Sequence, residues 1–237
     1  MSKSKALSVC VVIPAYNEAA VIKTVVDDVK RAIGDSKYEG SVVVVDDGSK
    51  DDTAAVAERA GAHVIRHILN SGAGAATATG LSYAQREGFS YAATMDADGQ
   101  HLAKDVLAGF EKIQSSDKDL LIGSRLIDSS GMSKVKIIGN KGLSFITYLL
   151  FGINSTDSQS GLRVFSRRSL EELRWKTSGY EFCSEMLWRA KQTGLQIGEY
   201  PITAVYTEYS KSKGQSNWNA INIIKSLLVR RITELLG

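Results

Sequence analysis

The sequence predicts an α/β fold in which a mostly parallel central sheet carries helices on both faces. Over the first 125 residues, short β-branched runs alternate with helical patterns at the spacing of crossover connections. Polar and acidic clusters follow the first, second and fourth expected strands, at Pro14–Glu18, Asp46–Ser49 and Asp96–Gln100. Ligands bind outside the carboxyl ends of the strands in such sheets, so these clusters also predict where the site lies.

Each element follows from its hydrophobic pattern. Leu7–Ile13 is a β-branched run typical of a strand buried on both faces, and Pro14 is expected to stop it. A helix is expected from Asn17 or Glu18 to about Ile33, with an apolar stripe along one side. The remaining expected strands are Ser41–Val45, Ala62–His67, Phe89–Met95, Leu120–Ser124, Leu162–Ser166 and Ile197–Val205. The remaining expected helices are Thr53–Ala60, Gly72–Arg86, Ala103–Gln114, Val135–Phe151 (one helix or two), Glu181–Thr193 and Trp218–Leu236.

Composition and charge exclude several classes of protein. Apolar content of 43% and charged content of 23% are typical of a soluble globular chain. A net charge of +3, without a basic stripe interleaved with aromatic residues, does not indicate nucleic-acid binding. No apolar signal region precedes the first strand, and no run reaches the roughly 18 apolar residues of a membrane span. Cys10 and Cys183 lack metal-ligand spacing and are expected to be buried, reduced thiols, which indicates a cytoplasmic protein.

An acidic pair at the end of the fourth expected strand is the most informative feature of the chain. Asp96 and Asp98 are two residues apart, so in an extended chain both carboxylates point to the same side. Mg²⁺ is commonly held by one or two carboxylates together with the phosphates of a substrate. The pair therefore predicts a metal and diphosphate site, with a solvated acidic turn as the alternative.

Several motifs occur in a characteristic order along the chain. They are Val12-Ile-Pro-Ala-Tyr-Asn-Glu18, Val45-Asp-Asp-Gly-Ser49, Met95-Asp-Ala-Asp-Gly-Gln-His101, Gly123-Ser-Arg125 and Asp157-Ser-Gln-Ser-Gly-Leu-Arg163. With these motifs the chain resembles the family 2 glycosyltransferases, which have the GT-A fold, over nearly all of its length. Within that family it looks most like the polyprenyl-phosphate sugar synthases of the dolichyl-phosphate mannosyltransferase type. It also resembles bacterial enzymes that build cell-surface glycans.

The resemblance implies a division of the chain and a set of nucleotide-binding residues. Residues 1–217 would form one GT-A domain, with a nucleotide-binding half at 1–125 and an acceptor half at 126–217, and residues 218–237 a C-terminal amphipathic helix. The nucleotide-binding residues that it implies are Pro14, Ala15, Tyr16, Glu18, Asp47, Asp96, Ala97 and Lys213. Tyr16 can pack on the base and Asp47 matches the position that reads it. Glu18 can meet the base or ribose, although an acid favoured at a helix start is the alternative. Asp46 is expected to brace its loop instead.

The resemblance also implies a metal site and cationic groups. Asp96, Asp98 and Gln100 would hold Mg²⁺ or Mn²⁺, which neutralises the charge that builds on the leaving diphosphate. Arg125 and Arg163 suit the diphosphate or an acceptor phosphate, because a guanidinium can grip phosphate with two hydrogen bonds. A surface ion pair is the alternative for each arginine. Lys213 lies in a segment that resembles a flexible cationic loop, which closes over the diphosphate in such enzymes. Lys211 is the alternative residue for this role.

Two further acids are candidates for handling the acceptor. Glu185 and Asp157 would act as a general base or would position the acceptor. A sugar hydroxyl needs a base to take its proton, whereas a lipid phosphate is already anionic near neutral pH. An exposed helix acid is the alternative for Glu185, and the resemblance gives no fixed role to His101.

The reaction expected from these residues is an inverting, metal-dependent transfer of a sugar from a UDP- or GDP-sugar to a polyprenyl phosphate. The alternative acceptor is a growing cell-surface glycan or a lipid-linked saccharide. A dinucleotide-binding oxidoreductase would require Gly-x-Gly-x-x-Gly directly after the first strand, where Pro14–Glu18 stands instead. A non-catalytic binding module would have no need of the acidic pair.

Two segments predict contact with a membrane surface, which would place the enzyme at the cytoplasmic face. Lys134–Lys141 is basic and is followed by the apolar run Leu143–Phe151, while the final helix carries Lys225, Arg230 and Arg231. Basic amphipathic helices bind anionic interfaces. Both helices could instead pack on the core or on a second subunit, so a homo-oligomer stays open.

Overall fold

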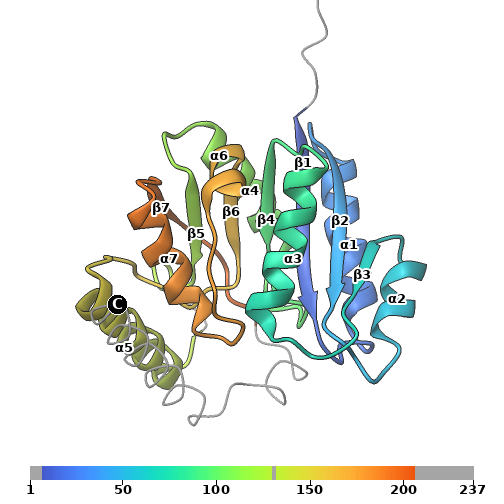
Figure 1. Cartoon of the computed structure of the whole chain (residues 1–237), viewed down its shortest axis with the longest axis horizontal. Helices are drawn as coiled ribbons and strands as arrows, with labels where there is room; N and C mark the ends of the chain where they lie inside the picture. The colour runs from blue at the N-terminus through green and yellow to red at the C-terminus, as the bar shows by residue number, and fades with distance from the viewer. Residues whose placement is uncertain (1–6, 130–131, 206–237) are drawn as a thin grey trace, which may run out of the picture.

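The computed structural model describes residues 7–129 and 132–205, and these form one layered α/β structure (Figure 1). The strands are β1 (Ser8–Ala15), β2 (Glu39–Asp46), β3 (His63–Arg66), β4 (Tyr91–Thr94), β5 (Leu120–Ser124), β6 (Arg163–Ser166) and β7 (Ile197–Pro201). The helices are α1 (Ile22–Gly34), α2 (Thr53–Arg59), α3 (Ala73–Arg86), α4 (Ala103–Gln114), α5 (Lys134–Phe151), α6 (Arg167–Glu172) and α7 (Phe182–Gln192).

The strands form one seven-stranded sheet in the order β3-β2-β1-β4-β6-β5-β7. β1 pairs parallel with β2 and β4, β2 with β3, and β5 with β7. β6 alone runs antiparallel, between β4 and β5. In Figure 1, α3, α6 and α7 lie in front of the sheet, and α1 and α4 lie behind it. The predicted fold class, a mostly parallel sheet with helices on both faces, is confirmed.

A separate hydrophobic core fills each side of the sheet. Val9, Val11 and Ile13 of β1 point into the core under α1 and α4, and Cys10 and Val12 point into the other. This alternation explains why β1 reads as a continuous apolar run. Both cysteines of the chain are buried and free, as expected. Burial raises the pKa of the Cys10 thiol to about 12.

The expectation that Pro14 stops the first strand is wrong. β1 continues to Ala15, and Pro14 lies in register with Val45 of β2. The ladder between β1 and β4 has already ended at Val12. Proline lacks only a backbone donor, and at this position no neighbouring strand on the β4 side requires one.

The expected start of the first helix, at Asn17 or Glu18, is also wrong, because α1 begins at Ile22. The backbone N–H groups of Asn17 and Glu18 are bound to side chains of the loop after β2. Asn17 moreover has a φ of 55°, which lies outside the helical region. This segment is therefore shaped by its contacts with a neighbouring loop.

The second half of the chain follows the predicted order with one addition. α6 was not expected from the pattern. It is a single short helix that follows β6 directly, and Ser166 caps it by accepting a hydrogen bond from the Ser169 backbone N–H. β7 ends at Pro201, four residues before the expected Val205. Among the described residues, no helix combines the length and apolar character needed to cross a bilayer. Lys211, Lys213 and the helix expected at Trp218–Leu236 lie outside the described residues.

Candidate active site

The loops that follow β1 and β2 are bound to each other at the carboxyl end of the sheet. The Asn17 backbone N–H donates to Ser49 Oγ at 2.9 Å, and the Glu18 N–H donates to Thr53 Oγ1 at 2.8 Å. In return the Lys50 N–H donates to Asn17 Oδ1 at 2.8 Å. These bonds fix the edge formed by the residues expected to cradle a nucleotide. Pro14 and Ala15 form the end of β1 there, and Tyr16 and Glu18 follow them.

Within this edge, the side chain of Tyr16 remains 38% exposed. An aromatic ring with an open face can pack on a planar base. The position of Tyr16 is therefore compatible with the role that the sequence suggests, and that role stays a prediction.

The two acids after β2 have different surroundings. Asp46 is fully buried, accepts a hydrogen bond from the Ser49 N–H at 3.0 Å and has Arg66 Nε within 3.1 Å. It braces its own loop, as expected. Asp47 is also buried, and it accepts from the backbone N–H groups of Ser71 at 2.9 Å and Gly72 at 2.7 Å.

Asp47 therefore fixes the segment in front of α3. His67 adds a contact of 2.7 Å from Nδ1 to Asp47 Oδ1. Gly72 has a φ of 94°, and a Cβ there would lie 2.4 Å from the Ser178 carbonyl oxygen. Only glycine fits this close approach. The base-reading role of Asp47 stays a prediction, and in this structure both carboxylate oxygens are bound to the chain itself.

The acidic pair lies just after β4. The Asp96 side chain is 53% exposed, and the Asp98 side chain is half-buried. Asp98 accepts a hydrogen bond from the Gln100 backbone N–H at 3.0 Å and another from the Gln100 side-chain amide. Gln100 thus lies next to the pair, as expected, with its amide group turned to Asp98.

The two carboxyls differ in their electrostatic environment. Partial loss of contact with water raises the pKa of Asp96, but the hydrogen bond and charge of His101 and the charges of Arg125 and Arg163 outweigh this effect. The pKa of Asp96 therefore lies below the ordinary value. Burial, and then the negative charge of Asp96, raise the pKa of Asp98. The two acids therefore repel each other while fixed cations attract Asp96.

His101 is a site residue to which sequence reasoning gave no role. Its ring is buried, and Nε2 lies 3.1 Å from Asp96 Oδ2. Its other nitrogen, Nδ1, is buried and has no hydrogen-bond partner in the described part of the chain. The only available signal was its place directly after the acidic motif. The contact orients the Asp96 carboxylate.

The donor set fits a hard divalent cation that takes most of its ligands from elsewhere. Among residues 7–129 and 132–205, no three His, Cys, Asp or Glu side chains are close enough to form a metal cage. Asp96 and Asp98 supply two carboxylates, and their mutual repulsion is what a bound cation would relieve. Mg²⁺ is often bound in this way, by one or two carboxylates with water and phosphate oxygens.

Arg125 and Asp157 form a bidentate pair. Arg125 Nε donates to Asp157 Oδ2 at 2.7 Å, and Nη2 donates to Oδ1 at 2.8 Å. The Arg125 backbone N–H also donates to Oδ2, at 3.1 Å. Asp157 is fully buried. The general-base role of Asp157 stays untested, and the structure places its carboxylate against Arg125 at the end of β5.

Arg163 is buried and not part of a surface ion pair, so that alternative is wrong. Its guanidinium donates to the carbonyl oxygens of Ser158 at 2.7 Å, Ser160 at 3.1 Å and Cys183 at 3.0 Å. It thereby joins the loop before β6 to α7. Its charge still acts on Asp96, and its direct contact with a phosphate stays a prediction.

Glu185 is fully buried, so the alternative of an exposed helix acid is wrong. Its carboxylate accepts from the Lys176 N–H at 3.1 Å, the Thr177 N–H at 2.8 Å and the Thr177 hydroxyl at 2.6 Å. The same segment continues to Ser178, whose carbonyl oxygen accepts from the Gly74 N–H at 2.7 Å. Glu185 therefore positions the segment that packs against the start of α3.

Tyr180 lies on this segment and was missed by sequence reasoning. Its side chain is 49% exposed. Burial, followed by the negative charges of Asp96 and Asp98, raises the pKa of its phenol. The phenol therefore lies within electrostatic range of the acidic pair. No motif marks this residue in the sequence, because its loop and the acidic pair meet only in the folded chain.

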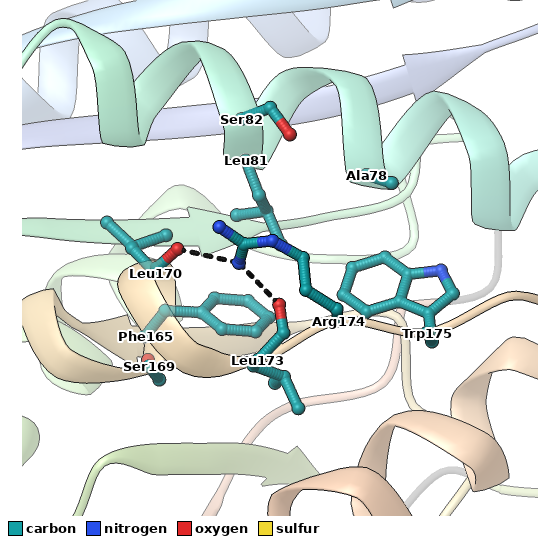
Figure 2. Close-up of a pocket in the computed structure, with 9 residues that line it drawn as sticks. All are labelled: Ala78, Leu81, Ser82, Phe165, Ser169, Leu170, Leu173, Arg174 and Trp175. Atoms are coloured by element: carbon teal, nitrogen blue, oxygen red, sulfur yellow. Dashed lines mark hydrogen bonds between the residues drawn. The ribbon is translucent and has the colours of Figure 1, made fainter.

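A small hollow of about 40 Å³ lies elsewhere, between α3 and α6 (Figure 2). Arg174 lies across it and donates to the carbonyl oxygens of Leu170 at 3.0 Å and Leu173 at 2.7 Å. Leu81, Phe165 and other apolar side chains line it. Sites for drug-sized ligands enclose several hundred Å³. The hollow is a gap in side-chain packing.

The model of the family described as "Glycosyl transferase family 2" matches residues 10–174. The chain belongs to glycosyl transferase family 2. The UDP-N-acetylglucosamine–dolichyl-phosphate N-acetylglucosaminyltransferase of Methanococcus voltae is 39% identical over 95% of this chain and 96% of its own length. The polyprenol monophosphomannose synthase of Mycolicibacterium smegmatis is 30% identical over 86% of this chain and 79% of its own length.

This glycosyltransferase has the GT-A fold. The structure of glucosyl-3-phosphoglycerate synthase from Mycobacterium tuberculosis, in complex with Mn²⁺, UDP and glucosyl-3-phosphoglycerate, matches it with a TM-score of 0.68 and 19% identity. The match covers 95% of this glycosyltransferase and 80% of that chain. The predicted family and fold are confirmed.

Proposed function

We propose that this glycosyltransferase moves a sugar from a UDP- or GDP-sugar to a polyprenyl phosphate, with inversion and with the help of Mg²⁺ or Mn²⁺. The observation that carries the proposal is the Asp96–Asp98 pair at the carboxyl end of β4, beside the edge formed by the loops after β1 and β2. Both named relatives transfer sugars to polyprenyl-type phosphates, which supports the choice of acceptor. A structure of similar fold that contains Mn²⁺ and UDP supports the choice of donor and metal.

The residues of the chain have distinct tasks in this reaction. Tyr16 and Glu18 meet the nucleoside, on an edge that is fixed by the loop after β2. Asp96 and Asp98, with Gln100, would hold the metal, and His101 orients Asp96. When bound, the ion neutralises negative charge on the departing diphosphate.

The transfer step needs no proton acceptor. An oxygen of the acceptor phosphate attacks the anomeric carbon, the bond from that carbon to the nucleoside diphosphate breaks, and the diphosphate leaves with the electron pair. The Arg125 guanidinium, held by Asp157, adds fixed positive charge beside the acidic pair. Glu185 is buried, and its carboxylate accepts hydrogen bonds from the Lys176 and Thr177 N–H groups. This arrangement suits the scheme, because the reaction requires no side chain to act as a base.

A thermal-shift panel of UDP- and GDP-sugars, with and without Mn²⁺, tests donor and metal together. A ligand that binds the native state raises the unfolding temperature by mass action. We expect a shift that needs Mn²⁺ and at least one nucleotide sugar, and that is lost in Asp98→Asn. Asp117→Asn, at an exposed acid before β5, is the matched control and keeps the shift. A flat response of the wild-type protein to the whole panel would contradict the proposal.

The acceptor is tested by incubating a labelled donor with undecaprenyl or dolichyl phosphate in detergent. We expect a sugar-phosphoryl-lipid whose anomeric configuration, read by NMR, is opposite to that of the donor. The alternative acceptor is a growing cell-surface glycan or a lipid-linked saccharide. Label appearing only in such a saccharide would select that alternative.

A further inference from the structure

Helix α5 has a second apolar side that nothing in the described part of the chain covers. Its buried side packs inward through Leu143, Ser144, Thr147 and Phe151. Large apolar side chains that are each more than half exposed lie elsewhere on the same helix: Val135, Ile138, Phe145, Tyr148 and Leu149. At 3.6 residues per turn, they fall on the side opposite to the buried residues. So many large apolar side chains on one exposed helix side indicate an interaction surface.

The charge of α5 indicates what kind of partner this side fits. The helix contains Lys134, Lys136 and Lys141 and has no acidic residue. Helical spacing places Lys134 and Lys141 next to the exposed apolar side chains, and both lysines are exposed. Apolar side chains flanked by lysine are typical of helices that lie in the surface of an anionic bilayer.

The buried side of α5 is bound to the loop that carries Asp157. Ser144 Oγ donates to the Thr156 carbonyl oxygen at 3.2 Å and accepts from the Ser158 N–H at 3.0 Å. The Thr147 hydroxyl lies 3.3 Å from Ser158 Oγ. Asp157, between these contacts, holds Arg125. One side of α5 thus supports the loop that binds Arg125, while no described residue covers the other side.

The same loop reaches the acidic pair. A Cβ at Gly161 would lie within 2.5 Å of the Asp96 carboxylate, so the loop backbone packs directly against that side chain. In Figure 1, α5 lies at the lower left, at the end of the molecule where β1 and β2 end. Helix α5 and the site therefore lie at the same end of the molecule.

We propose that the exposed side of α5, formed by Val135, Ile138, Phe145, Tyr148 and Leu149 with Lys134 and Lys141, docks on an anionic lipid bilayer. This docking presents a lipid-borne phosphate to the loop that contains Asp157, which binds Arg125. The inference rests on the proposed acceptor, because a lipid-borne acceptor has to be reached at a membrane surface. The bilayer is bound through its headgroups and upper acyl chains, and α5 itself does not cross it.

Co-sedimentation with vesicles tests this docking surface in the full-length protein. One vesicle preparation contains equal amounts of phosphatidylcholine and phosphatidylglycerol, and the other contains phosphatidylcholine alone. We expect binding to the first preparation, weakened by salt because the attraction is partly electrostatic. Phe145→Gln with Leu149→Gln should lower the partition coefficient at least about tenfold. Lys134→Gln with Lys141→Gln should lower it by about fivefold for each lysine removed.

Matched controls lie at the opposite end of the sheet. Leu7→Gln removes an exposed apolar side chain at the amino end of β1, and Lys37→Gln with Lys112→Gln removes two exposed lysines there. We expect these variants to bind like the wild-type protein. Circular dichroism would reveal whether the Phe145→Gln and Leu149→Gln pair impairs folding. In that case the Lys134→Gln and Lys141→Gln pair still tests the docking surface.

The proposed docking surface would be contradicted if the wild-type protein did not bind anionic vesicles. It would also be contradicted if the α5 variants bound these vesicles as well as the control variants do. A dimer that the Phe145→Gln and Leu149→Gln pair dissociates, in protein that does not bind vesicles, would assign the surface to a second copy of the chain. The vesicles contain no polyprenyl phosphate, so this assay is independent of catalysis. Failure of sugar transfer with intact vesicle binding would contradict the proposed function and leave the docking surface standing.

Discussion

The surroundings of Asp98 disfavour the ionised form of its carboxyl group. Burial and the nearby Asp96 carboxylate both raise its pKa, while its hydrogen bonds from Gln100 only partly offset this. A carboxyl with a raised pKa in the folded state makes the folded state less stable once the group is ionised. Ionised Asp98 therefore lowers the stability of the folded state in the absence of a cation, as expected for a site kept for binding.

Replacement of this residue should separate stability from binding. In the presence of a chelator at neutral pH, we expect Asp98→Asn to raise the unfolding temperature by about 1 to 3 °C, because the charge repulsion is removed. The pKa of Asp98 is raised, so wild-type stability falls as the pH rises through it, and the difference between the proteins should disappear at acidic pH. Differential scanning fluorimetry measures both effects. A lower unfolding temperature for Asp98→Asn would contradict this electrostatic account.

Glu185 allows a test between a general base and a positioning residue. Glutamine would turn an N–H group toward the N–H groups that the carboxylate now accepts from, so we expect Glu185→Gln to lower the free energy of unfolding by about 1–3 kcal/mol. Urea denaturation measures this loss. Below the unfolding transition, kcat should stay within about tenfold of wild type. A loss of a thousandfold or more in kcat, with unchanged stability and KM, would identify Glu185 as the base.

The chemical types of the site residues could be predicted from the sequence, but the direction in which several of them point could not. The spacing of Asp96 and Asp98 placed both carboxylates after one strand. Arg163 and Glu185 are buried, and the groups that they contact in the described chain could not be predicted, while their expected roles toward a phosphate or acceptor stay predictions. Their partners are mostly backbone groups of loops without regular structure, and a pattern of side chains carries no information about these.

At the scale of elements, the loop after β4 and the loop before β6 are in close contact at the acidic pair. The loop before β6 brings Gly161 against the Asp96 carboxylate. We expect Gly161→Ala to displace that carboxylate and to weaken Mn²⁺ binding, measured by calorimetry with UDP, by about tenfold or more. Gly139→Ala is the matched control, because a Cβ at this exposed position of α5 meets nothing within 4 Å. Equal Mn²⁺ affinity in both variants would show that the close approach has no effect on the site.

Elements in which apolar residues recur with a clear period could be predicted, whereas elements whose bounds depend on contacts with neighbouring segments could not. The bounds of α4 and β5 agree with the expected Ala103–Gln114 and Leu120–Ser124, because each is set by its own pattern. The start of α1 differs by several residues, since the loop after β2 binds the backbone that would have continued the helix. Local propensity gives way to such contacts.

For the whole molecule, the position of β6 joins the two halves of the chain. β6 comes from the second half in sequence, yet it lies between β4 and β5 of the first half and pairs with both. The nucleotide and acceptor halves expected from the sequence therefore share one sheet. Neither half of the sheet is complete without the other.

This pairing predicts a single cooperative unfolding transition. Tryptophan fluorescence reports on the chain after residue 125, because Trp175, Trp188 and Trp218 all follow that point, and hydrogen exchange of the β1 amides reports on the first half. We expect both probes to give the same urea midpoint, because loss of β6 removes one neighbour from each of β4 and β5 and divides the sheet. Separate midpoints would mean that residues 1–125 hold their structure independently.

The late arrival of β6 also has a consequence for the nascent protein. Ribosomes add about 5–20 residues per second, so roughly 2 to 8 seconds pass between synthesis of Ser124 and Ser166. Throughout that interval β4 and β5 each carry an edge whose eventual neighbour has not been made. Open edges invite pairing with other chains, so translation pauses between these two points should increase aggregation, and chaperones that shield emerging strands should suppress it.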